Sequence, residues 1–330
     1  MKKRIVAVVL CMAMILSLAA CGGNNGGGNS GGGNSGAKTK ITLATGGTSG
    51  MYYAVGNALA TTLNEKLTKS TLEVTSTGAS KANVQEIASN DSQMAILQSD
   101  VLNYAHQGSG GEAMFQGNAQ KGALWVAGLY NETVQLVSKT DITDISQLKG
   151  KSVVVGDVGS GTALNAEQVL EAYGMTFNDI KVINGSFSTG ADMLKNGQCD
   201  AVFTVAGTPT AALMELASTY TFNVLSLSPE AVKFLTDKYP FLVQENMPAN
   251  TYKNQDKEVV CVAVKAVLVA SDKLSEDVVY EITKALFENQ KALGQAASKL
   301  EPLTNQSAVD GSFDLHPGAL KYYKEAGIIK

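Results

Sequence analysis

The chain has 330 residues, of which 45% are hydrophobic and 17% are charged, and its formal net charge is −4. Loss of Lys2, Lys3 and Arg4 with an N-terminal signal changes that charge to −7, which argues against nucleic acid or an anionic membrane surface as a partner. Arg4 is the only arginine, so the mature chain has no guanidinium group to hold a carboxylate through two hydrogen bonds.

The first 21 residues have the layout of a bacterial secretory signal. Three cationic residues precede an apolar run over residues 5–20, which only Ser17 interrupts. The run ends in Leu18-Ala19-Ala20-Cys21, which resembles a lipobox, so we expect residues 1–20 to be removed and Cys21 to carry a lipid. A transmembrane anchor is the alternative, but the run is shorter than the ~20 apolar residues that a spanning helix needs.

The signal is followed by a tether. Residues 22–37 contain only Gly, Asn, Ser and one Ala, so they cannot build a core and are predicted to span roughly 22 Å as a flexible chain. We therefore expect residues 21–37 to connect a lipid anchor in the cell membrane to an extracytoplasmic body. That body has about 290 residues, which suits two lobes.

Strands and helices are predicted to alternate from the start of the body. A strand over 41–45 leads into a glycine loop, 46–50, and then into a helix over 51–67, whose apolar residues recur every fourth position. A strand over 72–76, a turn over 76–80, a helix near 82–89 and a strand over 94–98 follow.

The same order recurs about 110 residues later. It begins with a strand over 152–155, a glycine loop over 156–162 and a helix over 163–173. A strand over 180–183, a hydroxyl-rich turn over 188–192, a short helix to residue 196 and a strand over 200–205 complete it. The repeated order predicts two lobes of similar build.

Alternation of this kind predicts an α/β fold with parallel strands and a ligand cleft between two lobes. The β-rich run 259–270 can cross back to the first lobe, where helices over 276–293 and 318–326 complete it. We assign residues 38–137 and 260–330 to the first lobe and residues 138–259 to the second. Such receptors close by hinge bending.

The two glycine loops are the candidate ligand sites. Each runs from a strand end to a helix N-terminus, where free N–H groups and the helix dipole favour an anion. Ordinary helix capping is the alternative for either loop alone, but the corresponding positions of the pair favour a ligand site. The loops contribute Gly46, Gly47, Thr48, Ser49 and Gly50, and Ser160, Gly161 and Thr162.

The sequence does not favour an enzyme. It contains no phosphate-binding or dinucleotide-binding glycine motif and no nucleophile elbow, and His106 and His316 stand alone. Cys199 and Cys261 lie in apolar stretches and are predicted to be buried thiols, with a disulfide as the alternative. We therefore expect no catalysis, no cofactor and no metal.

The order of motifs resembles the TAXI family, the solute receptors of TRAP transporters. The resemblance covers nearly all of the mature body. It is carried by residues 45–53, Ser76-Thr77-Gly78-Ala79-Ser80 with Asn83, Ala95-Ile96-Leu97-Gln98-Ser99-Asp100, Leu129-Tyr130-Asn131-Glu132, residues 148–151 and 159–166, Gly197 with Asp200-Ala201-Val202-Phe203, Gly207-Thr208-Pro209, and His316-Pro317-Gly318-Ala319 with Tyr322-Tyr323.

The resemblance implies a type II periplasmic-binding-protein fold and capture of a small organic acid or an amino acid such as glutamate or glutamine. The partner would be a TRAP permease driven by an ion gradient, and the receptor would be a monomer. A binding protein of an ABC importer or of a sensor system is the alternative. Carried over by position, the cleft would be lined by the two glycine loops with Tyr52, Tyr53, Gln98, Tyr130 and Asn165, and less securely by Ser80, Asn83, Gly207 and Thr208.

Overall fold

The computed structural model describes residues 38–110 and 114–330. Residues 37–330 form one compact unit. The predicted signal, Cys21 and the whole tether lie outside the described residues. Within the described residues, no helix has the length and apolar character needed to cross a membrane.

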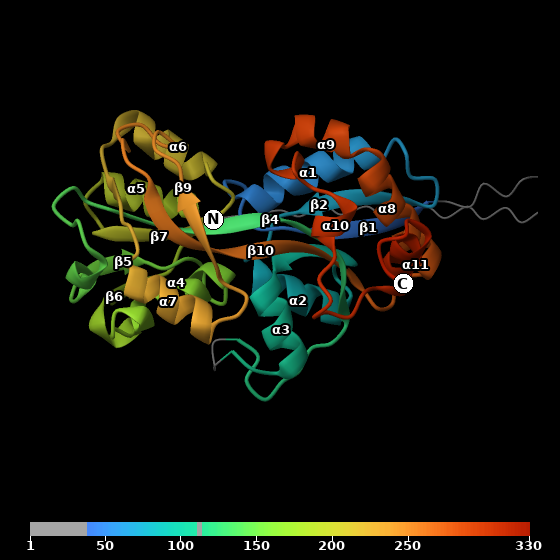
Figure 1. The fold of residues 1–330 in the computed structure, drawn as a ribbon, viewed down its shortest axis with the longest axis horizontal. Coiled ribbons are helices and arrows are strands. Elements are labelled where there is room, and N and C mark those ends of the chain that lie inside the picture. The colour runs from blue at the N-terminus through green and yellow to red at the C-terminus, as the bar shows by residue number, and fades with distance from the viewer. Residues whose placement is uncertain (1–37, 111–113) are drawn as a thin grey trace, which may run out of the picture. The chain divides into compact units, whose positions relative to one another are not determined.

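A single mixed sheet runs through the described unit (Figure 1). Its strand order is β2-β1-β3-β10-β4-β7-β5-β6, with β8 paired to β4 and β9 paired to β10. The strands are β1 (Thr39–Ala44), β2 (Ser70–Thr75), β3 (Met94–Gln98), β4 (Ala123–Ser138), β5 (Ser152–Val154), β6 (Lys181–Ile183), β7 (Ala201–Ala206), β8 (Asn223–Val224), β9 (Val243–Met247) and β10 (Val259–Ser271).

Two long strands, β4 and β10, join two lobes. They pair antiparallel with each other, and each also pairs antiparallel with a lobe's own sheet, β10 with β3 and β4 with β7. The strands β1, β2 and β3 are parallel to one another, as are β5, β6 and β7. The predicted parallel pattern therefore holds within each lobe, whereas the two strands that connect the lobes pair antiparallel.

Helices cover both faces of the sheet in each lobe. Figure 1 shows α1 and α8 on one face of the first lobe and α2 and α3 on the other. The helices are α1 (Met51–Leu63), α2 (Ser80–Ser89), α3 (Ser99–Gln107), α4 (Gly161–Ala172), α5 (Phe187–Lys195), α6 (Ala211–Thr219), α7 (Pro229–Lys238), α8 (Glu276–Glu288), α9 (Gln290–Ala296), α10 (Asn305–Ala308) and α11 (Pro317–Glu325), with 3-10 turns at Ile145–Leu148, Phe177–Asp179 and Ser298–Leu300.

Three predicted elements are wrong in extent. The helix expected over 51–67 ends at Leu63, because the side chain of Asn64 pairs with both backbone groups of Leu72 and turns the chain toward β2. The helix expected over 276–293 is two helices that meet at Asn289. The turn expected over 188–192 is the first part of α5, which Ser186 caps.

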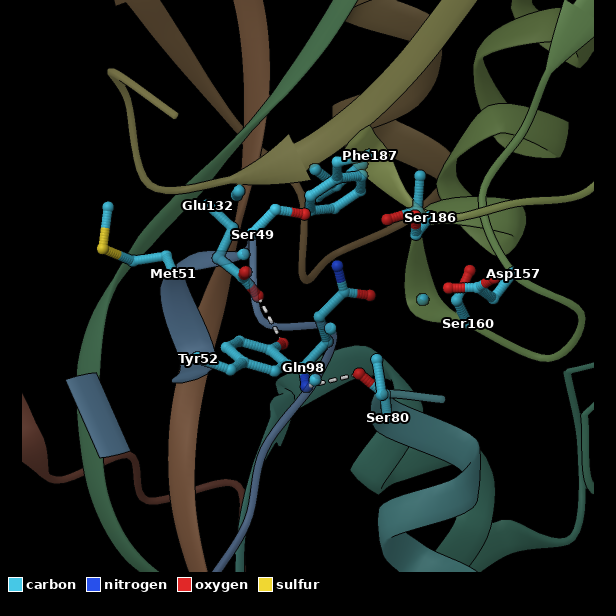
Figure 2. Close-up of a pocket in the computed structure, with 18 residues that line it drawn as sticks. Ser49, Met51, Tyr52, Ser80, Gln98, Glu132, Asp157, Ser160, Ser186 and Phe187 are labelled. Carbon is cyan, nitrogen blue, oxygen red and sulfur yellow. Dashed lines mark hydrogen bonds between the residues drawn. The ribbon is translucent and has the colours of Figure 1, made fainter. Parts of the chain in front are cut away.

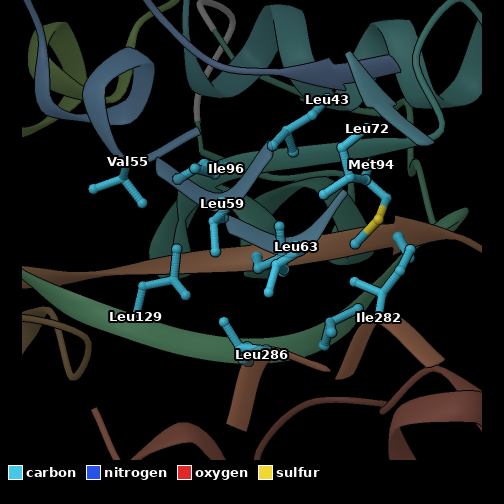
Figure 3. Packing of buried hydrophobic residues seen from close by; sticks show 14 of the residues in the cluster. Leu43, Val55, Leu59, Leu63, Leu72, Met94, Ile96, Leu129, Ile282 and Leu286 are labelled. Atoms are coloured by element: carbon cyan, nitrogen blue, oxygen red, sulfur yellow. The ribbon is translucent and has the colours of Figure 1, made fainter. Parts of the chain in front are cut away.

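Each lobe has its own apolar core on each face of the sheet. In the first lobe, Leu43, Leu59 and Ile282 are fully buried between the sheet and the helices α1 and α8 (Figure 3). In the second lobe, Phe203 and Leu235 are equally buried. Burial of one such side chain contributes about 1.5–3 kcal/mol. The lobe boundaries assigned from the sequence stay a prediction.

Both cysteines of the described body are buried, free thiols. Burial raises the pKa of Cys199 to about 11 and that of Cys261 to about 12, so both stay protonated at neutral pH. The predicted disulfide alternative is therefore not what the structure shows.

Candidate ligand-binding site

A pocket lies where the N-termini of helices from both lobes meet (Figure 2). Its free space, counted together with the part that is open to solvent, is about 540 Å³. Its lining residues are Gly46, Gly47, Ser49, Gly50, Met51, Tyr52, Ala79, Ser80, Gln98, Glu132, Asp157, Ser160, Gly161, Thr162, Ser186, Phe187, Val205 and Ala206.

The first glycine loop connects β1 to α1 and forms one wall. The N–H of Gly50 donates to the carbonyl of Gly47 over 2.9 Å, so the loop turns tightly before α1 begins. The hydroxyl of Ser76, which directly follows β2, donates to the carbonyl of Gly46 over 2.9 Å and so fixes the loop to the end of that strand. No side chain caps α1, which leaves the N–H groups of its first turn for a ligand.

The second glycine loop connects β5 to α4 and forms the opposite wall. Gly156 and Gly159 have φ values of +94° and +75°, a region that only glycine enters without strain. The side chain of Ser160 accepts the N–H of Ala163 over 3.1 Å and so caps α4. Ordinary capping therefore accounts for Ser160, although the residue also lines the pocket.

A third helix N-terminus, that of α5, also reaches the pocket. Ser186 accepts the N–H of Thr189 as the cap of this helix, and Phe187 contributes an aromatic wall. Sequence analysis missed both residues. A serine followed by an apolar residue at the start of a helical pattern is the cap signal that would have indicated them.

The pocket also contains acidic groups. Glu132 on β4 is 2% exposed, and its Oε2 accepts a hydrogen bond of 2.6 Å from the hydroxyl of Tyr52. Burial is the main cause that raises the pKa of Glu132 well above its usual value, and hydrogen bonds from Tyr52 and Gln98 partly offset it. Burial likewise raises the pKa of Asp157. No lysine or arginine is among the lining residues.

A chain of buried polar side chains continues behind the pocket. The Nε2 of Gln98 donates to the Oδ1 of Asn165 over 3.2 Å, and the Nδ2 of Asn165 donates to the Oδ2 of Asp100 over 3.1 Å. Burial raises the pKa of Asp100 to about 6, against hydrogen bonds that favour the ionised form. This chain connects the first lobe, at the end of β3, to α4 of the second lobe.

The structure brings ten of the predicted residues together around the pocket. These are Gly46, Gly47, Ser49, Gly50, Tyr52, Ser80, Gln98, Ser160, Gly161 and Thr162. Their role in binding stays a prediction. The unpredicted lining residues are Met51, Ala79, Glu132, Asp157, Ser186, Phe187, Val205 and Ala206.

Seven predicted residues lie outside the pocket lining. Thr48 is exposed and Tyr53 is half-buried on α1. Asn83 is buried and donates to the carbonyls of Thr45 and Ile96, so it supports the first glycine loop. Tyr130 is buried, and its hydroxyl has no hydrogen-bond partner among the described residues. Asn165 lies behind Gln98, and Gly207 lies beside Met51. The hydroxyl of Thr208 donates to that of Thr133.

The two histidines have structural contacts. The Nδ1 of His316 accepts the N–H of Gly318 and caps α11, and His106 lies 2.7 Å from the carbonyl of Ala123. Within residues 38–110 and 114–330, no group of three or more His, Cys, Asp or Glu side chains is placed to hold a metal ion.

A mixed sheet shared by two lobes, with helix N-termini around the pocket, defines the two-lobed periplasmic-binding-protein fold. The chain belongs to the NMT1-like family, whose model matches residues 43–327.

Two solved structures share the fold. PhnD1 from Prochlorococcus marinus, solved with methylphosphonate, is 12% identical with a TM-score of 0.52 over 88% of this chain and 99% of that one. An ancestral arginine-binding protein bound to arginine is 14% identical with a TM-score of 0.50 over 80% and 98%. At these identities the likeness shows the fold alone. The narrower TAXI resemblance stays a prediction.

Proposed function

We propose that this chain is an extracytoplasmic solute-binding receptor that captures a small amino acid or organic acid and delivers it unchanged to a membrane importer. The observation that carries the proposal is the pocket between the lobes, where the N-termini of α1, α4 and α5 converge without any cationic side chain. Three dipole ends and unpaired N–H groups suit a carboxylate.

The acidic groups favour an amino acid over a plain acid. Burial keeps Glu132 protonated in the empty pocket, so a ligand with only anionic groups gains no opposite charge there, whereas a cationic group of the ligand would pair with the carboxylate once it has released its proton. An ammonium group beside Glu132 and a carboxylate at the helix N-termini satisfy both ends of the pocket.

The type of importer is a separate choice. The TRAP assignment has support only from the sequence resemblance, and neither the family match nor the two structures described above names a TRAP receptor. We therefore put the alternative, an ABC importer, first. Collapsing ion gradients while ATP is retained would stop uptake of the ligand only with a TRAP permease, and depleting ATP would stop it directly with an ABC importer.

The lipid at Cys21 is part of the same proposal. It would hold the receptor at the outer face of the cell membrane, and residues 22–37 would let the body reach the importer. Replacement of Cys21 by Ala is expected to abolish lipid attachment, which metabolic labelling with a fatty acid would detect.

Thermal shifts test the binding function. Residues 37–330, which form one compact unit, are unfolded and refolded to remove any carried ligand and then screened against amino acids, their deaminated analogues, alkylphosphonates and sugars. A ligand at a hundredfold excess over its Kd stabilises the protein by about 2.7 kcal/mol. A shift with amino acids supports the proposal, whereas shifts with neutral sugars alone would refute it. Mass spectrometry of the recovered ligand checks that it is unchanged.

A further inference from the structure

Gln98 presents a buried hydrogen-bond acceptor to the pocket. It is the last residue of β3, its side chain lines the pocket, and it is 2% exposed. Its Oε1 has no hydrogen-bond partner among the described residues. A buried acceptor without a partner has lost its hydration without compensation, so a donor from the ligand would relieve the penalty.

The hydrogen-bonded side chains behind Gln98 determine which atom of the Gln98 amide faces the ligand. Asn165 donates through Nδ2 to the Oδ2 of Asp100 and to the Oε1 of Gln168, over 3.1 and 2.9 Å. An ionised carboxylate can only accept, so Asn165 must turn its amide nitrogen toward Asp100 and its oxygen toward Gln98. The Nε2 of Gln98 therefore donates to the oxygen of Asn165, and its Oε1 remains available to a ligand in the pocket.

This row of hydrogen-bonded side chains, Gln98–Asn165–Asp100, crosses from one lobe to the other. Gln98 and Asp100 flank the start of α3 in the first lobe, whereas Asn165 lies on α4 in the second. A Cβ on Gly161, the first residue of α4, would lie only 1.7 Å from the Oε1 of Gln98, so the two lobes touch at this point. Leu164 also packs into an apolar cluster of the first lobe. Figure 2 shows the side chain of Gln98 reaching toward Ser160.

We propose that Asn165 is a positioning residue that makes recognition of a ligand donor depend on lobe closure. When α4 swings away, Gln98 loses Asn165 and keeps only Glu132 as a partner for its amide nitrogen, so its oxygen is no longer held at the start of α4 beside the ligand. A ligand that carries an N–H donor opposite its carboxylate gains this contact only in the closed state. The same acid without the donor leaves this acceptor unsatisfied and gains only its carboxylate contacts from closure. The inference rests on the proposed function, because it specifies how that same pocket selects its ligand.

Calorimetry with matched ligands tests the coupling. The probes are the amino acid that gives the largest thermal shift and the same acid without its ammonium group, which for glutamate is glutarate. For the wild type we expect preference for the amino acid. In N165A the affinity for the amino acid falls by about 10-fold or more, while the affinity for the deaminated acid changes by less than about 2-fold. N178A, which removes an exposed asparagine of the same lobe, is the control and keeps the preference.

Exchanging the amide of Asn165 with the carboxylate of Asp100 distinguishes a positioning role of Asn165 from a general loss of structure. N165D places a second carboxylate against Asp100, so the pair is expected to share a proton, and the preference should be lost when alkaline pH removes that proton and the two carboxylates repel each other. In the double variant D100N/N165D, the amide at position 100 can donate to the carboxylate at position 165, which still accepts from Gln98. We expect this double variant to recover the preference and the ligand-induced decrease in radius of gyration measured by X-ray scattering.

Two results would overturn the inference while leaving the receptor function intact. One is equal weakening of both ligands in N165A, because that is what a merely structural asparagine would cause. The other is a double variant that stays as poor as N165D in both preference and compaction. A wild-type protein that binds no amino acid would instead refute the proposed function.

Discussion

Ionisation of Asp100 should destabilise the folded protein, and D100N tests this directly. The side chain is 2% exposed, and burial raises its pKa from 3.8 to about 6. Because the folded-state pKa is above the unfolded one, the stability that the protonated group contributes is complete below pH 3.8 and is lost as the pH rises through about 6. A shift of about two units corresponds to a loss of about 3 kcal/mol. An asparagine retains an acceptor for Asn165 but cannot ionise.

Urea unfolding of the ligand-free body from pH 4 to pH 8 measures the effect. The stability of D100N relative to the wild type should rise by about 2.4 kcal/mol between these limits, and most of the rise should fall between pH 4 and pH 6.5. D256N changes an exposed carboxyl and should show no comparable trend. A difference between D100N and the wild type that stays constant with pH would refute the reasoning, because it would mean that burial does not penalise the charge.

Three further predictions concern single residues. G161A should weaken amino-acid binding by about 10-fold, because the new Cβ would displace the amide of Gln98, and it should also lower stability by about 1–3 kcal/mol, because Asn165 would lose its buried partner. Unchanged affinity in calorimetry would show that this amide can move freely. Burial should keep Glu132 protonated in the empty pocket, so binding of an ammonium group should release a proton. Calorimetric titrations in buffers of different ionisation enthalpy should detect this proton with the wild type and not with E132Q. G318A should lower the free energy of unfolding by about 2–3 kcal/mol, because its Cβ would lie 2.3 Å from the backbone oxygen of Glu276, whereas G311A, which meets nothing within 4 Å, should cost far less in the same urea titration.

The local elements were largely predictable because their signals are local. The strand over 94–98 was predicted with the bounds it has in the structure, and it is buried throughout. The two glycine loops were placed correctly between strand and helix, and in the second loop glycine at positive φ and the hydroxyl cap from Ser160 are properties of a few adjacent residues. The helix boundary at Leu63 was missed because it depends on Asn64 reaching Leu72 in the next strand.

The strand β4 shows the opposite case. It spans Ala123–Ser138 and is buried almost throughout, so its sequence lacks the alternation that marks a half-exposed strand. Its antiparallel pairing with β10 depends on residues more than a hundred positions away. Because Glu132 lies on this strand, missing the strand also meant missing the acidic group of the pocket.

The sequence by itself determined the build of the body: repeated strand, glycine loop and helix, with polar groups where the strands end. It also determined that Arg4 is the only arginine, so residues 5–330 offer no guanidinium group to an anionic ligand. Only the tertiary structure decided which polar groups face one another, because hydrogen bonds such as that from Gln98 to Asn165 join residues 67 positions apart on different lobes. That juxtaposition arises from the return of β10 beside β3 and β4, a long-range pairing that no local pattern encodes.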